Sequence, residues 1–177
     1  MILSFFSRKA SQNVVDRLYG EIVAASRRPP LYQPPYGVAD TVEGRFELLT
    51  LHACLVLRRL SALPAPAPDL AQDLANRIFQ DFDAALRSMG VGDLTVPKRM
   101  KTLAENFGGR NTAYAEAMGD GGRLQAAIAR NVYGVDEPDA AAALARYVGR
   151  AATAMDAAPF AAFEVGPVPF PPLESRP

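Results

Sequence analysis

The sequence has little of what metal and redox sites need. Among 177 residues, Cys54 is the one cysteine and His52 the one histidine. One cysteine cannot form an internal disulfide, which fits a reducing compartment. Zinc and haem sites usually draw on several His or Cys ligands, whereas these two lie two positions apart on a predicted helix and face different directions. We therefore expect no metal site and no cofactor. Cys54 is interpreted as a small buried apolar residue, and His52 as a core-edge residue that bonds a neighbouring carboxylate.

Net charge and long apolar runs are also missing. Lys and Arg together number 19, as do Asp and Glu, so the formal net charge is zero. A neutral chain has no general attraction to nucleic acid, and we expect no specific DNA binding, although a local basic patch stays open. The longest apolar runs fall far short of the roughly 20 residues that cross a bilayer, which predicts no transmembrane segment. The first apolar residues precede Arg8 and Lys9, the reverse of a secretory signal peptide, so a cytoplasmic location is expected.

The chain also lacks the sequence patterns of catalytic sites. No serine stands in a nucleophile-elbow sequence, so a Ser-His-Asp triad is discounted. The run from Gly90 to Asp93 resembles a phosphate-binding loop only faintly, because it has neither the Walker lysine nor a preceding strand. We therefore predict no catalytic residue and a non-enzymatic function. A small helical enzyme that uses His52 as acid or base stays open as an alternative.

Helical periodicity, by contrast, is present in nearly every segment. The pattern predicts an all-α fold, an irregular single-domain bundle of about six or seven helices. The second helix is apolar on well over half of its circumference and is expected at the centre of the core. Gly90 is expected to end the third helix, and Gly108 with Gly109 the fourth. The predicted helices cover about 11–27, 40–60, 69–90, 95–107, 111–118, 122–133 and 136–155.

Composition divides the chain into three regions. Residues 1–10 form a short apolar and basic N-terminal segment, residues 11–158 a helical domain, and residues 159–177 a Pro-rich tail. In the tail, phenylalanine and valine alternate with proline, a pattern that cannot stay helical for long. We expect this Pro/Phe-rich segment to form an extended C-terminal strap on the helices, with a tail that awaits a partner as the alternative.

Aromatic residues near the N-terminus are the first candidates for binding. Phe5 and Phe6, followed by the cations Arg8 and Lys9, are typical of a short interfacial anchor for a membrane. The alternative is a frayed terminus, or a contact with the first helix. A second candidate surface is the proline-rich connector near residues 29–36, which carries Tyr32 and Tyr36.

A cluster of cations on the fourth predicted helix is the other candidate. Lys98 and Lys101 are three residues apart and share a helix face, and Arg110 follows. Such a basic edge could meet lipid phosphates, ribosomal RNA or an acidic partner. The alternative is a solvated face whose cations pair with Asp93 and Glu105.

The start of the second helix carries a capping signal. Asp40 is expected to cap the helix, and Glu43, three residues later, to complete a capping box. Arg45 in the first turn is unfavourably placed for the helix dipole. We expect a specific ion pair to offset this, with Asp83 or Asp93 as its partner.

Two stretches of the chain resemble the ubiquinol–cytochrome c chaperone family, the cytochrome b assembly factors of bacteria and mitochondria. The resemblance extends over about residues 19–134. The first stretch is GVADTVEGRFEL at 37–48, with His52 downstream; the second is GVGDLTVPKRMK at 90–101, followed by Gly109, Arg110 and Tyr114.

The resemblance implies a helical, membrane-associated assembly factor of the respiratory chain. Such a chaperone binds newly made cytochrome b and promotes assembly of the ubiquinol–cytochrome c reductase complex. The sequence is similar to bacterial members, and peripheral contact with the cytoplasmic face of the inner membrane, or with the ribosome, is implied as well. Holding a hydrophobic client needs an exposed apolar surface with a charged rim, and no acid–base pair.

The candidate residues fall into two groups. One group is expected to be mainly architectural: Asp40, Glu43, Arg45, His52 and Asp93. The other is expected to bind client or membrane: Phe5, Phe6, Tyr32, Tyr36, Lys98, Lys101, Arg110 and Tyr114. A ribosome or RNA adaptor that uses residues 98–110 stays open as a further alternative.

Overall fold

Helices form all the regular structure in the described part of the chain. The computed structural model describes the backbone of residues 2–174, and their side chains except those of residues 2–10 and Pro138. These residues hold seven α-helices, three short helical segments and no strand, which confirms the all-α prediction. In chain order the elements are α1 Ile2–Ser26, η1 Pro29–Tyr32, α2 Val42–Ala62, α3 Ala67–Ser88, α4 Val96–Ala117, α5 Gly121–Ile128, η2 Ala129–Tyr133, η3 Pro138–Ala141, α6 Ala142–Ala157 and α7 Phe160–Val165.

The helix α2 lies at the centre of the fold. It contacts α1, α3, α4 and α6, so side chains on nearly every side of it are buried. Leu48, Leu51 and Leu55 on this helix are at most 1% exposed. The wide apolar face of α2 therefore has the central position that the sequence predicted.

The N-terminus of α2 corrects two expectations. The cap is Thr41, not Asp40: the Thr41 side chain accepts a hydrogen bond from the Gly44 amide at 3.1 Å. Asp40 instead pairs with Arg45, at 2.6 Å from its Nε atom, so neither Asp83 nor Asp93 is the partner of that arginine. The reason is a shift of one residue. With Thr41 as the cap, the carboxylate of Asp40 lies just before the helix and can pair with the Arg45 side chain near the start of α2.

The helix α4 is longer than predicted. It continues through Gly108 and Gly109 to Ala117, so a stop at these glycines was wrong and the helix expected at 111–118 is its second half. A glycine in a helix costs about 1 kcal/mol relative to alanine. Phe107 and Tyr114, on either side of the pair, are at most 6% exposed, and burying two large aromatic side chains outweighs that cost.

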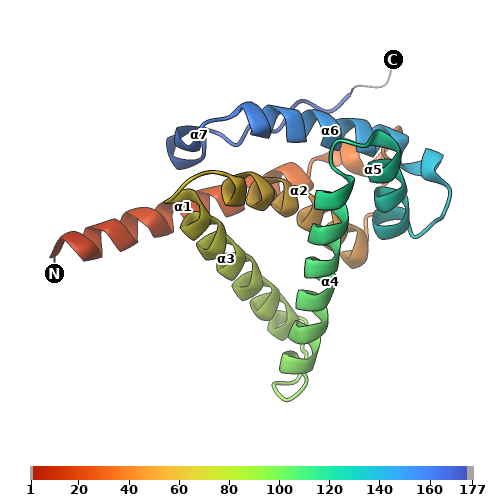
Figure 1. Cartoon of the computed structure of the whole chain (residues 1–177). Coiled ribbons are helices and arrows are strands. Elements are labelled where there is room, and N and C mark those ends of the chain that lie inside the picture. Colours follow the sequence, from red (N-terminus) through yellow and green to blue (C-terminus); the bar gives the residue numbers. More distant parts are fainter. Residues whose placement is uncertain (1, 175–177) are drawn as a thin grey trace.

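The helices α3 and α4 form an antiparallel hairpin. Figure 1 shows it as two arms whose joining loop lies far from the α6 side of the molecule. The predicted stripe of α3 is buried throughout, including Leu74, Ile78 and Phe82. Phe79 and Phe82 pack edge-on against Phe107 of α4, with ring centroids 5.4 and 6.4 Å apart.

Both ends of the helical array differ from expectation. The first helix begins at Ile2 rather than near Ser11. At the other end, residues 160–165 form α7, where an extended chain was predicted from Pro159 onward. Six residues free of proline separate Pro159 from Gly166, which is long enough for one helical turn and a half. Pro167 has no amide hydrogen to continue the helix, and residues 167–174 have no regular secondary structure.

Two glycine substitutions test this description of α2 and α4. A Cβ atom at Gly44 would lie 2.0 Å from the carbonyl oxygen of Ala39, so Gly44→Ala should lower the free energy of unfolding by about 2 kcal/mol or more. A Cβ atom at Gly108 meets nothing within 4 Å. Gly108→Ala should therefore raise stability by about 0.5–1 kcal/mol if α4 is continuous. Urea unfolding followed by circular dichroism measures both, and a loss of stability in Gly108→Ala would contradict the continuous helix.

Candidate functional site

The loop between α3 and α4 presents apolar side chains to solvent. Leu94 is 98% exposed and Met89 is 57% exposed. They are two of the four large hydrophobic residues that are exposed in the part of the chain with described side chains. Scattered exposed apolar residues need no explanation, but two at one protruding loop with cations beside them form a candidate contact surface. We call residues 89–101, the loop with the first turns of α4, the hairpin end.

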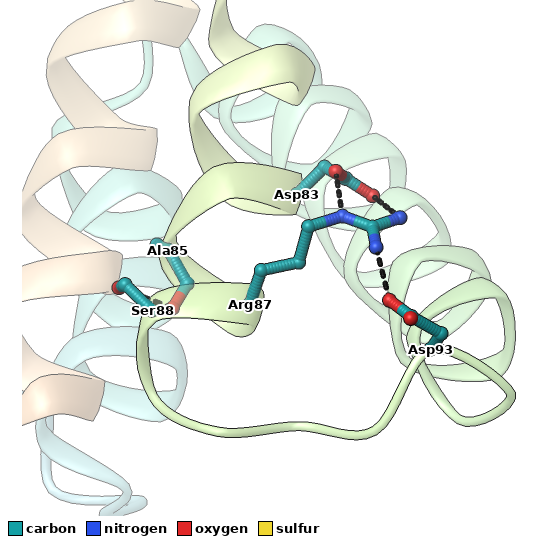
Figure 2. Close-up of polar contacts among 5 residues, drawn as sticks. All are labelled: Asp83, Ala85, Arg87, Ser88 and Asp93. Atoms are coloured by element: carbon teal, nitrogen blue, oxygen red, sulfur yellow. Dashed lines mark hydrogen bonds and ion pairs between the residues drawn. The ribbon is translucent and has the colours of Figure 1, made fainter.

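An arginine on α3 fixes the shape of this loop. Figure 2 shows the Arg87 guanidinium between two carboxylates, with Nε at 2.7 Å from Asp83 and Nη1 at 2.5 Å from Asp93. Asp93 thereby ties the loop to the last turn of α3. These groups are exposed, so the pairs contribute little to global stability. Their effect is on the geometry of the loop, because they join it to the last turn of α3.

The cations of the hairpin end are only partly paired. Lys98, Arg99 and Lys101 are all exposed. Lys101 lies 3.9 Å from Glu105, a weak pair between two side chains that are mostly in water. Lys98 and Arg99 have no ion-pair partner among the described side chains, because Asp93 is engaged by Arg87. The hairpin end therefore combines two exposed apolar side chains with uncompensated positive charge.

Arg110 does not belong to this exposed edge. Its guanidinium forms a two-pronged pair with Glu47 of α2, with both N–O distances 2.5 Å, and the Glu47 side chain is only 9% exposed. Burial raises the pKa of Glu47, and the charge of Arg110 opposes that shift. Tyr114, one turn further on, is 1% exposed. Arg110 and Tyr114 therefore attach α4 to α2 and do not face a partner in this conformation.

Glu47 is a residue that the sequence reasoning did not single out. Its spacing carried a signal, because Glu47, Leu51 and Leu55 fall four residues apart on the buried face of one helix. A carboxylate in such a stripe requires a cation from another element. The sequence did not show that this cation is Arg110, 63 positions away.

His52 is completely buried, and its partner is a tyrosine rather than the expected carboxylate. Its Nδ1–H donates to the Leu48 carbonyl at 2.7 Å, so Nε2 accepts from the Tyr147 hydroxyl at 3.0 Å. Arg28 in turn donates to the same hydroxyl. Burial, aided by the charge of Arg28, lowers the pKa of His52 to about 4. The imidazole is therefore neutral near pH 7, with both nitrogens engaged, and is poorly placed for acid–base work.

The connector tyrosines face the protein interior. Tyr36 is 1% exposed, and its carbonyl accepts a hydrogen bond from the Tyr133 hydroxyl at 2.6 Å. Tyr32 is half-buried, and its hydroxyl donates to the Ser26 carbonyl at 2.9 Å. Cys54 is buried as expected, and burial raises the pKa of its thiol to about 12, so it is unreactive. The side chains of Phe5 and Phe6 lie outside the described ones.

In the part of the chain that the structure describes, no three His, Cys, Asp or Glu side chains gather as metal ligands would. No helix within residues 2–174 combines the length and the apolar character that crossing a membrane requires.

Comparison with known proteins gives a family and a fold. Residues 35–170 match the family model described as ubiquinol–cytochrome C chaperone. The chain is also similar to the crystal structure of the Cbp3 homolog from Brucella abortus, with 37% sequence identity, a TM-score of 0.85 and 98% of each chain covered. No curated protein matches the sequence.

The pair of Arg110 and Glu47 predicts a large effect of a single truncation. Arg110→Ala leaves a buried carboxylate without its cation, which should lower the free energy of unfolding by about 2–3 kcal/mol at pH 7. The loss should shrink as the pH falls, because protonation of Glu47 removes the uncompensated charge. Lys101→Ala, which breaks an exposed pair on the same helix, is the control and should change stability little. Equal effects of the two substitutions would contradict this assignment.

The buried histidine predicts a specific dependence on pH. Because the pKa of His52 is about 4 in the folded protein and about 6.5 when unfolded, the unfolded state takes up the proton first. His52 should therefore cost up to about 3 kcal/mol of stability as the pH falls from 6.5 to 4, with no further loss below. As His52 is the one histidine, its imidazole proton signals can be followed by NMR without ambiguity. A signal that titrates near pH 6.5 in the folded protein would refute the neutral, buried ring.

Proposed function

Because the chain belongs to the ubiquinol–cytochrome c chaperone family, we propose that its client is newly made cytochrome b. In this proposal it holds that subunit until the ubiquinol–cytochrome c reductase complex assembles. The observation that carries the proposal is the family match over residues 35–170, supported by 37% identity to the Cbp3 homolog across nearly the whole chain. A helical holder with no clustered metal ligands among its described residues suits this role.

The hairpin end is the surface we assign to the client. A hydrophobic membrane subunit offers apolar segments for Leu94 and Met89, and anionic groups beside them can pair with Lys98 and Lys101. Burying one large apolar side chain contributes about 1.5–3 kcal/mol, so two such residues support only a reversible complex. Reversibility is what a chaperone needs, because the client must be handed on.

The other predicted binding residues have different places in this proposal. Arg110 and Tyr114 are paired or buried, so they shape the protein rather than meet the client, and Tyr36 is buried in this conformation. Phe5 and Phe6 are kept as a second contact with client or membrane. Since cytochrome b is a membrane protein, we propose a peripheral position on the cytoplasmic face of the inner membrane.

The alternative functions gain little support from the described residues. An enzyme built on His52 would need an accessible nitrogen and a carboxylate beside it, and this ring has neither. An RNA adaptor would need a broad basic surface, whereas only Lys98 and Arg99 of the hairpin end lack an acidic partner. We therefore propose a non-enzymatic function.

Affinity purification from solubilised membranes tests the client and the surface together. The tagged chain should recover cytochrome b, and the double variant Leu94→Asp with Lys98→Glu should recover at least tenfold less. Both side chains are exposed, so the variant should stay folded. Val42→Asp, at an exposed position in the first turn of α2, is the matched control and should bind like the wild type. Recovered cytochrome b is measured as polypeptide by mass spectrometry, which detects the subunit with or without its haem.

Two outcomes would contradict the proposal in different ways. If the wild-type chain recovers no cytochrome b, the client is wrong. If the double variant and the control recover it equally, the surface is wrong. Deleting the gene gives an independent check, because the level of spectroscopic cytochrome b should fall while transcription of its gene stays normal.

A further inference from the structure

The segment from Gly166 to Glu174 lies on the helices without forming a helix or strand. We call it the tail segment. Four of its nine residues are proline. It follows α7 and runs back along α6, as the blue trace in Figure 1 shows. A backbone without a helix or strand ladder must find other hydrogen-bond partners, so its contacts show what the surface beneath it recognises.

Side chains of the helical body bind the main chain of the tail segment. The donors and acceptors come from α1, from the connector between α1 and α2, and from α6. Three arginines donate to carbonyl groups of the tail segment: Arg17 Nη1 to Gly166 (2.5 Å), Arg28 Nη1 to Pro171 (3.1 Å) and Arg150 Nη2 to Pro172 (3.5 Å). Two side chains accept from its amides: the Glu21 carboxylate accepts from Val168 (2.5 Å), and the Tyr36 hydroxyl accepts from Glu174 (2.7 Å). Since these bonds go to backbone atoms, most of the recognition does not depend on the sequence of the bound segment.

The balance of donors and acceptors fits a proline-rich peptide. Three arginines donate to carbonyls of the tail segment, while only Glu21 and Tyr36 accept from its amides. Proline has a carbonyl but no amide hydrogen, so a proline-rich segment presents more acceptors than donors. Proline also restricts the unbound chain, which lowers the entropy lost on binding.

Side chains of the tail segment add two apolar contacts and two ion pairs. Val168 is 6% exposed. The ring of Phe170 meets the His52 ring edge-on, with centroids 5.2 Å apart. At the far end, the Glu174 carboxylate lies between Arg150 and Arg146, with the Arg146 contact at 3.4 Å.

From these contacts we infer that the tail segment occupies a peptide-binding groove. Its other occupant is an extended, proline-containing segment of the client polypeptide with a carboxylate at the position of Glu174. The inference rests on the proposed function for the identity of the client. Aromatic groups in the groove strengthen it, because proline-rich peptides are commonly bound on aromatic-lined surfaces, and the Tyr36 hydroxyl and the His52 ring both contact the tail segment.

Exchange of the two occupants is compatible with the rest of the fold. The Glu174 end is well exposed, since the side chains of Glu174 and Arg146 are 37% and 59% accessible. Releasing the tail segment breaks side-chain contacts but no hydrogen bond within a helix. A tethered segment competes at an effective concentration in the millimolar range. The groove therefore excludes weak ligands and opens only to a segment that binds more tightly than its own tail.

Peptide binding to the full-length chain tests the groove. The probe is a fluorescent nine-residue peptide with the sequence of residues 166–174, and the readout is fluorescence anisotropy. Glu174→Arg places a cation between Arg146 and Arg150 and should loosen the tail, so this variant should bind the peptide at least tenfold more tightly than the wild type. Adding Arg150→Glu should remove that gain. Phe170→Ala, which shortens a side chain on His52, provides an independent loosened variant should the first one fail to fold.

The results separate the groove from the client. Equal peptide affinity of wild type and loosened variants, with unchanged circular dichroism, would overturn the groove. In the affinity purification, Glu174→Arg should recover severalfold more cytochrome b than the wild type, and equal recovery would overturn client binding in the groove. Absence of cytochrome b from every sample would refute the proposed function, while the peptide result would still stand.

Discussion

The position of α2 between four other helices is the constraint on which the rest of the structure depends. Polar side chains that are buried along α2 are costly unless they pair within the protein. Glu47 finds its cation on α4, and His52 finds its hydroxyl on α6. Each pair joins α2 to a different helix, so the polar groups that burial makes costly also attach α4 and α6 to the centre. Buried leucines, among them Leu48, Leu51 and Leu55, fill much of the rest of its surface and add hydrophobic stabilisation.

This arrangement separates the structural residues from the surface that is open to partners. The polar groups most reminiscent of chemistry, His52, Tyr147 and Arg28, form one hydrogen-bonded chain inside the protein. Exposed apolar and cationic side chains lie elsewhere, at the hairpin end, and the tail segment covers the His52 ring. A chaperone of the ubiquinol–cytochrome c complex needs surfaces that bind and release, and it gains rigidity from the buried chain that shapes them.

Sequence patterns predicted the elements better than the contacts. The apolar faces of α2 and α3 were readable because hydrophobic periodicity records burial directly. The predicted end of α4 at its glycine pair was wrong. Each glycine lowers helix stability by about 1 kcal/mol relative to alanine, and this cost is smaller than the stabilisation from burying Phe107 and Tyr114. Exposure of Lys98 was predictable from charge alone. The burial of Tyr36 was not predictable, because tyrosine occurs both on the surface and in the interior. The hydrogen bond between His52 and Tyr147 was not predictable either, because the sequence around one residue does not indicate a partner far away in the chain.

The glycine pair in α4 also has a consequence for how the molecule opens. Residues before it pack mainly on α3 through Phe107, and residues after it are attached to α2 through Arg110. The two halves of one continuous helix thus belong to different packing units, joined where the backbone is least restricted. Amide hydrogen exchange should then find two cooperative units within α4. The hairpin end can exchange its protons by local opening while the centre of the protein stays closed.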